Sequence, residues 1–117
     1  MTFTFKVPPP PSVNSAFRNV AGKGRVKTKE YNIWRNNAVA LLLGTVKTRV
    51  AGSFSVTIDL PWNMRGDIDN RVKGIVDALV ASGKVDDDRF MDALHVYRTA
   101  IPPHAHVEVS PMTRLAS

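Results

Sequence analysis

Two groups of aspartates in the second half of the chain could support metal-dependent chemistry. Asp67 and Asp69 stand two residues apart, and Asp86, Asp87 and Asp88 form a run further along. Hard divalent cations such as Mg²⁺ bind oxygen ligands, commonly one or two carboxylates together with water and substrate phosphate. Such an ion can orient a scissile phosphate and ease deprotonation of the attacking water. The pattern therefore favours phosphodiester hydrolysis.

The same aspartates also fit a structural role. Asp67 can cap a helix, Asp69 can stabilise its first turn, and a run of aspartates can be a solvated loop. A calcium-binding loop is excluded, because the sixth position from Asp67 is Val72 rather than Gly and the twelfth is Ala78 rather than Glu. The carboxylates alone leave a metal site and a helix cap both open.

Lys73 stands four residues after Asp69 and four residues before Asp77. At helical spacing these charges can form ion pairs, each worth ~0.2 to 0.5 kcal/mol. Lys73 can also bind the scissile phosphate and stabilise the charge that develops on it. The two roles are compatible, so Lys73 is a candidate catalytic residue.

Chain geometry limits how the two aspartate groups could meet. A helix from Asp69 to Ser82 rises about 20 Å, and the six steps from Ser82 to Asp88 span at most ~20 Å when extended. Asp88 reaches Asp69 in the same subunit only if residues 83–88 run back along the helix. Otherwise the helix is shorter, or a second subunit completes the site.

Periodicity predicts the elements that position these residues. Alternating apolar residues predict strands, and apolar residues at helical spacing predict two helices. The expected strands cover residues 2–7, 53–60, 93–100 and 105–109, and the expected helices cover residues 28–46 and 67–82. Thr28 is the expected N-cap of the first helix, and Gly83 the expected C-terminal cap of the second. The last two strands are expected to pair as a hairpin through Pro102 and Pro103.

This order of elements predicts one α+β domain over residues 1–117, with a mixed sheet of about four strands and both helices on one face. The chain has no cysteine, which excludes disulfides, thiolate zinc sites and a cysteine nucleophile. Neither a signal peptide nor a membrane span is visible, so we expect a cytoplasmic protein without membrane contact. The sequence has no Gly-rich phosphate loop, and no small-molecule cofactor is expected.

Charge points to a nucleic-acid partner. Lysine and arginine outnumber acids sixteen to ten, and the formal net charge is +6. Residues 8–27 are predicted to form a long basic loop, because four prolines precede a stretch rich in Asn, Gly and Lys. Alternating basic residues in this arm can contact a phosphate backbone. The candidate DNA-binding residues are Asn14, Arg18, Lys23, Arg25, Lys27, Lys29 and Arg65.

The ordered set of motifs resembles the RusA-type Holliday junction resolvases, small endodeoxyribonucleases of bacteria and phages. The resemblance spans nearly the whole chain and lies in a Pro-rich start and a series of short motifs. These motifs are Pro10-Pro11-Ser12 with Asn14, Asp67-x-Asp69-Asn70, Lys73, Asp77-Ala78-Leu79, Gly83 and Asp87-Asp88. One departure is that the family often has a run of arginines before the first aspartate, where this chain has only Arg65 and then Gly66.

The resemblance implies roles for single residues. Asp67, Asp69 and Asp88 would be the metal-binding carboxylates, Lys73 the essential lysine and Asp87 the neighbouring acid. It also implies a homodimer that depends on Mg²⁺, with Mn²⁺ as a substitute, and makes paired nicks in four-way DNA junctions. The alternatives are a non-catalytic basic DNA-binding module, whose aspartates only cap a helix, and an RNA-binding or ribosome-associated factor.

Overall fold

The helices and strands follow the order expected from the sequence, with one additional pair of short strands. The computed structural model describes the backbone of residues 1–11, 17–20 and 24–112. The strands are β1 (Phe3–Val7), β2 (Phe17–Val20), β3 (Gly24–Lys27), β4 (Phe54–Pro61), β5 (Met91–Ala100) and β6 (Ala105–Pro111). The α-helices are α2 (Lys29–Thr45) and α3 (Val72–Ala81), and the 3₁₀ turns are η1 (Ile68–Arg71) and η2 (Asp88–Phe90).

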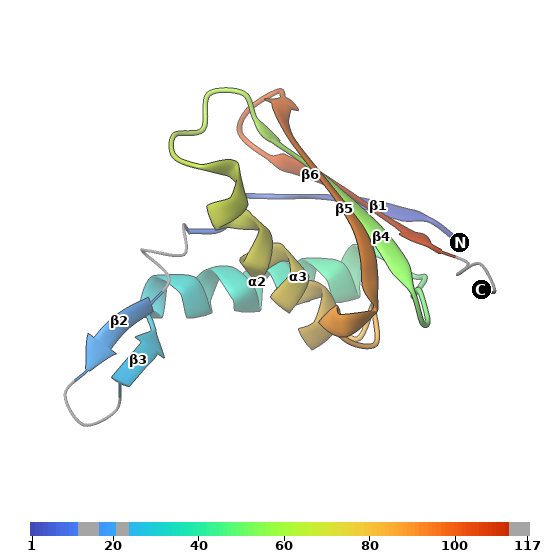
Figure 1. Ribbon diagram of the computed structural model, residues 1–117, viewed down its shortest axis with the longest axis horizontal. Coiled ribbons are helices and arrows are strands. Elements are labelled where there is room, and N and C mark those ends of the chain that lie inside the picture. The colour runs from blue at the N-terminus through green and yellow to red at the C-terminus, as the bar shows by residue number, and fades with distance from the viewer. Residues whose placement is uncertain (12–16, 21–23, 113–117) are drawn as a thin grey trace.

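Four strands form a mixed sheet in the order β1-β6-β4-β5. Strand β6 is antiparallel to both β1 and β4, whereas β4 and β5 are parallel. Helices α2 and α3 lie on the same side of this sheet (Figure 1). The α+β architecture, with a mixed four-stranded sheet and two helices on one face, is confirmed.

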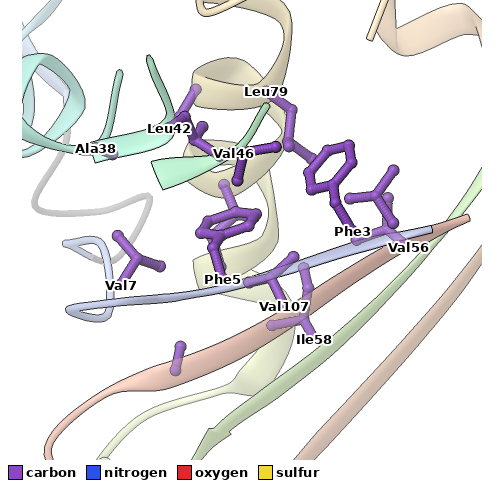
Figure 2. Packing of buried hydrophobic residues seen from close by; sticks show 14 of the residues in the cluster. Phe3, Phe5, Val7, Ala38, Leu42, Val46, Val56, Ile58, Leu79 and Val107 are labelled. Carbon is purple, nitrogen blue, oxygen red and sulfur yellow. The ribbon is translucent and has the colours of Figure 1, made fainter. Parts of the chain in front are cut away.

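The core lies between this sheet and the two helices. Alternate residues of β1, β4 and β6 are buried, as the two-residue period of a strand requires. Figure 2 shows Phe3 and Phe5 of β1 directed toward Leu42 and Val46 at the end of α2 and Leu79 of α3. Since both helices bury residues against the same sheet, their positions relative to β4 are fixed by packing.

Helix α2 begins at the predicted cap. The Thr28 hydroxyl accepts a hydrogen bond from the backbone N–H of Tyr31. Tyr31, Trp34, Ala38 and Leu42 are buried on one side of the helix. The Trp34 indole N–H donates to the carbonyl of Pro8 at 2.8 Å, so the proline segment after β1 is joined to the helix.

The second predicted helix is shorter than expected at its start. Residues 68–71 form the 3₁₀ turn η1, and the α-helix begins at Val72 rather than at Asp67. The predicted end is confirmed: Gly83 has a φ of 75° and donates to the carbonyl of Val80, while Lys84 donates to Leu79. This is the Schellman arrangement, which favours glycine because φ is positive.

The predicted hairpin between the last two strands is wrong. Strand β5 pairs in parallel with β4 at the edge of the sheet, and β6 lies between β1 and β4. Helix α3 connects β4 to β5, and a parallel pair needs such a crossover. Strand β6, in which alternate residues are buried, lies in the interior of the sheet. Strand β5, which is more exposed, lies at its edge.

The predicted long loop over residues 8–27 is also only partly correct. Strands β2 and β3 pair antiparallel, with Phe17 opposite Lys27 and Val20 opposite Gly24. These strands have four residues each, too few for alternation to identify them reliably in a polar segment. The basic arm therefore contains a two-stranded ribbon that ends next to the N-cap of α2 (Figure 1).

A bridge outside the main sheet connects two loops. Val50, between α2 and β4, pairs with Val85, between α3 and η2, and its N–H donates to the carbonyl of Lys84 at 2.9 Å. The Lys84 ammonium donates in turn to the carbonyl of Val46. Within the described residues, no helix has the length and apolar character needed to cross a bilayer.

Candidate active site

A groove of about 410 Å³ lies beside α3 and is lined by both charged and apolar side chains. Its charged residues are Asp69 of η1, Lys73 and Asp77 of α3, and Asp88 of η2. Its apolar residues are Val72, Val76, Met91 and Leu94. Because Asp69 precedes α3 and Asp88 follows it, the groove brings together one member of each aspartate group within one subunit.

The carboxylates of the first aspartate group have no hydrogen-bond or ion-pair partner among the described residues. Asp67 is the residue before η1, but its side chain makes no capping hydrogen bond. Asp67 and Asp69 are both exposed, and neither carboxylate is paired with a basic side chain within the part of the chain that is described. Both carboxylates are therefore accessible to a cation. Asp69 lines the groove, whereas Asp67 does not.

Two arginines shape the loop that leads to this group. The Arg98 guanidinium on β5 donates to the carbonyls of Gly66 at 2.6 Å and Met64 at 3.2 Å. Arg71 donates to the carbonyls of Arg65 at 3.3 Å and Pro10 at 2.6 Å. Sequence analysis did not identify either residue as part of the site. Their partners are backbone carbonyls, which carry no signature in the sequence.

The second aspartate group begins with Asp86, whose carboxylate is bound by other parts of the protein. Asp86 accepts from the backbone N–H of Gly52 at 2.9 Å and forms an ion pair with Arg49. The hydrogen bond from Gly52, and then that from Arg49, lower the pKa of Asp86. Asp86 thus fixes the loop, and it does not line the groove.

Asp87 and Asp88 are held beside each other at the start of η2. Asp87 accepts from the backbone N–H of Arg89 at 3.1 Å. That bond, followed by a side-chain hydrogen bond with Asp88, lowers the pKa of Asp87. The same bond to Asp87 raises the pKa of Asp88, while the charge of Lys73 opposes the rise. Asp88 therefore lies within electrostatic reach of both Asp87 and the lysine.

Lys73 points to the far end of the groove rather than to Asp69. Its ammonium lies 3.6 Å from a carboxylate oxygen of Asp77, one turn further along α3. The other oxygen of Asp77 accepts a hydrogen bond of 2.7 Å from the hydroxyl of Tyr31 on α2. Of the two ion pairs possible at helical spacing, the one with Asp77 forms. Tyr31 does not itself line the groove, but its hydroxyl is bound to Asp77, which does.

The chemistry of the carboxylates fits a hard divalent cation with an incomplete protein ligand set. Within the described residues, no group of three or more His, Cys, Asp or Glu side chains is close enough to hold a metal. Mg²⁺ commonly takes only one or two carboxylates and completes its shell with water and substrate phosphate. The accessible carboxylates of Asp69 and Asp88 in one groove meet that requirement.

The candidate DNA-binding residues are only partly within the described region. Lys29 and Arg65 are exposed, and the Lys27 ammonium lies 5.6 Å from the centre of the Tyr31 ring. Arg18 and Arg25 belong to the paired strands β2 and β3. Asn14 and Lys23 lie outside the described residues. The ribbon that carries these charges is thus joined directly to the helix that carries Tyr31.

Comparison with known proteins gives two matches that cover this site. The family model described as Endodeoxyribonuclease RusA matches residues 6–110. The chain is also similar to the crossover junction endodeoxyribonuclease rusA of Enterobacteria phage HK97. The two are 27% identical over 117 residues, which cover 98% of this chain and 97% of the phage protein. Both matches include the groove and the two aspartate groups.

Proposed function

Because the chain belongs to the RusA family of endodeoxyribonucleases, we propose that it resolves four-way DNA junctions by paired, Mg²⁺-dependent nicks. The observation that carries this proposal is the groove beside α3, where Lys73 lies between Asp69 and Asp88 along the chain of one subunit. In such a groove the lysine can bind a phosphate, and the carboxylates beside it can bind a metal ion. The expected biological setting is DNA recombination and repair.

In this proposal one or two of the carboxylates Asp67, Asp69 and Asp88 would hold Mg²⁺ at a time, with water and substrate phosphate completing its shell. Mn²⁺ could substitute for Mg²⁺. When bound, the ion neutralises charge on the phosphate and lowers the pKa of the attacking water. The Lys73 ammonium binds a non-bridging oxygen of the scissile phosphate. Asp87 is the acid next to Asp88, and its carboxylate is fixed by the backbone N–H of Arg89.

DNA binding is assigned to the basic arm and to Arg65. The net charge of +6 supports a polyanionic partner. We expect that replacing Lys23, Arg25 and Lys27 together by Ala weakens junction binding, because three phosphate contacts are lost. The slope of log affinity against log salt should become shallower by roughly two to three units. An unchanged slope would show that the arm does not contact the backbone.

A homodimer follows from the need for two cuts. A two-fold dimer presents two equivalent grooves to a junction whose strands are themselves related by a pseudo-two-fold axis. Light scattering of the 12.9 kDa chain should give twice this mass at micromolar concentration. A monomer mass, both with and without junction DNA, would contradict this part of the proposal.

The second candidate function is a non-catalytic DNA-binding module. It is favoured by the finding that the described residues contain no ready group of three metal-binding side chains. A module of this kind would bind the junction without cutting it. A nuclease whose Mg²⁺ is held by one or two carboxylates, water and DNA phosphate would instead need Mg²⁺ for cleavage but not for binding.

The deciding experiment uses a labelled four-way junction with and without Mg²⁺. We expect symmetric nicks only when the ion is present. Lys73→Ala should lower the single-turnover cleavage rate by orders of magnitude while the protein still binds the junction. Lys47→Ala is the matched control, because Lys47 is exposed just after α2 and, among the described residues, its ammonium bonds to the carbonyl of Gly44 and lies outside the groove. Binding without any Mg²⁺-dependent nick would favour the non-catalytic module.

A further inference from the structure

We infer that Tyr31 and Asp77 are positioning residues that hold Lys73 in place for phosphate binding. The inference rests on the proposed function, because it assumes that Lys73 contacts the scissile phosphate. The geometry that supports it is a continuous chain of contacts. The Tyr31 hydroxyl donates to one oxygen of Asp77, and the other oxygen of Asp77 faces the Lys73 ammonium.

The first member of this chain is held rigidly. Tyr31 is 2% exposed, and its ring stacks on Trp34 with 6.3 Å between the ring centres. Its backbone N–H is fixed by the N-cap Thr28. Burial, and then the hydrogen bond to Asp77, raise the pKa of the Tyr31 hydroxyl, so it stays protonated and donates to Asp77. The hydroxyl is therefore a fixed donor to Asp77, which lines the groove.

The second member transmits that position to the lysine. The Asp77 side chain is only 22% exposed, whereas that of Lys73 is 55% exposed. An exposed ion pair between flexible side chains contributes little order by itself. Here the carboxylate is already fixed by Tyr31, so the lysine has a fixed partner rather than a mobile one. Asp77 thus limits the positions that the Lys73 ammonium occupies above the groove.

The direction of Lys73 makes this arrangement relevant to the reaction. Asp77, Lys73 and Asp88 all line the groove. A phosphate placed between Asp69 and Asp88 would therefore meet the ammonium on the side where Asp77 holds it. Apart from Asp77, the carboxylates that line the groove are Asp69 and Asp88, which are proposed metal ligands.

The first test removes one hydroxyl. Tyr31→Phe keeps the ring and its packing but removes the hydrogen bond to Asp77. We expect the single-turnover cleavage rate at saturating junction to fall roughly tenfold, as for loss of a hydrogen bond to a charged group. Junction affinity, measured without Mg²⁺, should stay within about twofold of wild type, since the DNA-binding arm is unchanged. Tyr97→Phe is the matched control, because Tyr97 is half-exposed on β5 and its hydroxyl is not part of this chain of contacts.

A second variant tests the carboxylate. Asp77→Asn keeps an oxygen that can accept from Tyr31 but removes the charge that holds Lys73. We expect a decrease in cleavage at least as large as that of Tyr31→Phe, again with little change in affinity. Asp59→Asn is the control: it also removes one negative charge, but Asp59 lies in β4 and bonds to Thr99. Melting temperatures of all four variants show whether each is folded at the assay temperature.

A double-mutant cycle separates positioning from a merely structural role. If Tyr31 acts through Lys73, adding Tyr31→Phe to Lys73→Ala should change the residual rate by less than about twofold, because nothing is left to position. A structural role would lower the rate by the same factor in both backgrounds. Equal factors, or a Tyr31→Phe rate equal to wild type, would overturn the inference.

Failure of the proposed function gives a different result. In that case the wild-type protein itself shows no Mg²⁺-dependent nick in the junction, and Lys73 has no reaction to serve. Failure of the inference alone leaves wild-type cleavage and the Lys73→Ala defect intact, while Tyr31→Phe cleaves normally. The same set of rates therefore distinguishes the two outcomes.

Discussion

The two aspartate groups on either side of α3 are alike in sequence and different in structure. Before the helix, Asp67 and Asp69 are exposed, and no hydrogen bond or ion pair holds either carboxylate within the described region. After the helix, Asp86 is bound to Arg49 and Gly52, and Asp87 accepts from the backbone N–H of Arg89. The loop before the first group is held by arginine side chains that bond to its backbone carbonyls. The second group is held by the carboxylates of Asp86 and Asp87 themselves.

This difference shows how a small protein can build a site from one residue type. Asp86 fixes the loop, and Asp87 accepts a backbone hydrogen bond at the start of η2. Asp69 and Asp88 line the groove and can face a ligand. Carboxylates that stabilise the fold use their oxygens within the protein, whereas those that bind a cation must keep oxygens accessible. Matched substitutions in the two groups therefore test whether only the accessible carboxylates are needed for cleavage.

The largest difference between the two groups is expected when one charge is removed from each group in turn. Asp69→Asn should lower single-turnover cleavage of a four-way junction by orders of magnitude, because an amide is a poor replacement for an anionic Mg²⁺ ligand. Asp86→Asn should stay within about twofold of wild type, since an exposed ion pair contributes little. Similar defects in the two variants would remove the distinction between the groups.

A smaller effect is expected from the arginines that support each group. Arg98→Ala removes the donors to Gly66 and Met64, so the loop before Asp67 loses its support and cleavage should fall roughly tenfold, as for loss of charged hydrogen bonds. Arg49→Ala removes the partner of Asp86 and should have less effect on cleavage. If Arg49→Ala lowers cleavage more than Arg98→Ala in the same assay, the expected difference between the two groups is wrong.

The helix between the groups can be tested through its packing. A Cβ atom at Gly74 would lie 2.8 Å from Cβ of Pro10, whereas at Gly44 of α2 nothing lies within 4 Å. Gly74→Ala should therefore destabilise the protein by about 1 to 3 kcal/mol through overpacking. Gly44→Ala should stabilise it by up to about 1 kcal/mol through helix propensity. Urea denaturation measures both, and equal changes would show that the approach of Pro10 to α3 is not tight.

The smallest effect concerns the stability that Asp86 provides. Its pKa is lowered in the folded state, chiefly by the Gly52 N–H, so its contribution is present above the unfolded pKa and is lost as the pH falls through the folded pKa. Asp86→Asn should lower the melting temperature by roughly 1 to 4 °C at neutral pH. The difference from wild type should shrink as the pH is lowered below about 4. A constant difference across this range would mean that the charge is not responsible.

Local patterns predicted the elements of the fold but not all of their neighbours. Thr28 and Gly83 mark helix ends through their own chemistry, and alternation identified the strands of the main sheet. The partner of β5 could not be predicted in this way, because a hairpin and a parallel crossover use similar strands. The choice depends on where α3 packs, which is a property of the whole core.

The candidate site was predicted where function depends on residue type at short spacing. Asp69, Lys73 and Asp88 were identified from the sequence, and they line one groove. The supporting contacts were missed because they connect distant segments: Tyr31 to Asp77 across 46 positions, and Arg98 to Gly66 across 32. Neither pair has a spacing that periodicity can detect. Whether the predicted residues carry out catalysis stays a prediction for the cleavage assays.

The bridge between Val50 and Val85 gives the protein an internal reporter for hydrogen exchange. The amide hydrogens of Val50 and Gly52 donate to the carbonyl of Lys84 and the carboxylate of Asp86. Their exchange with solvent therefore requires the loop after α3 to open, although they lie far from it in the sequence. Neither residue lines the groove. Their exchange rates can thus show, without any mutation in the site, whether junction DNA tightens or loosens the loop that carries Asp88.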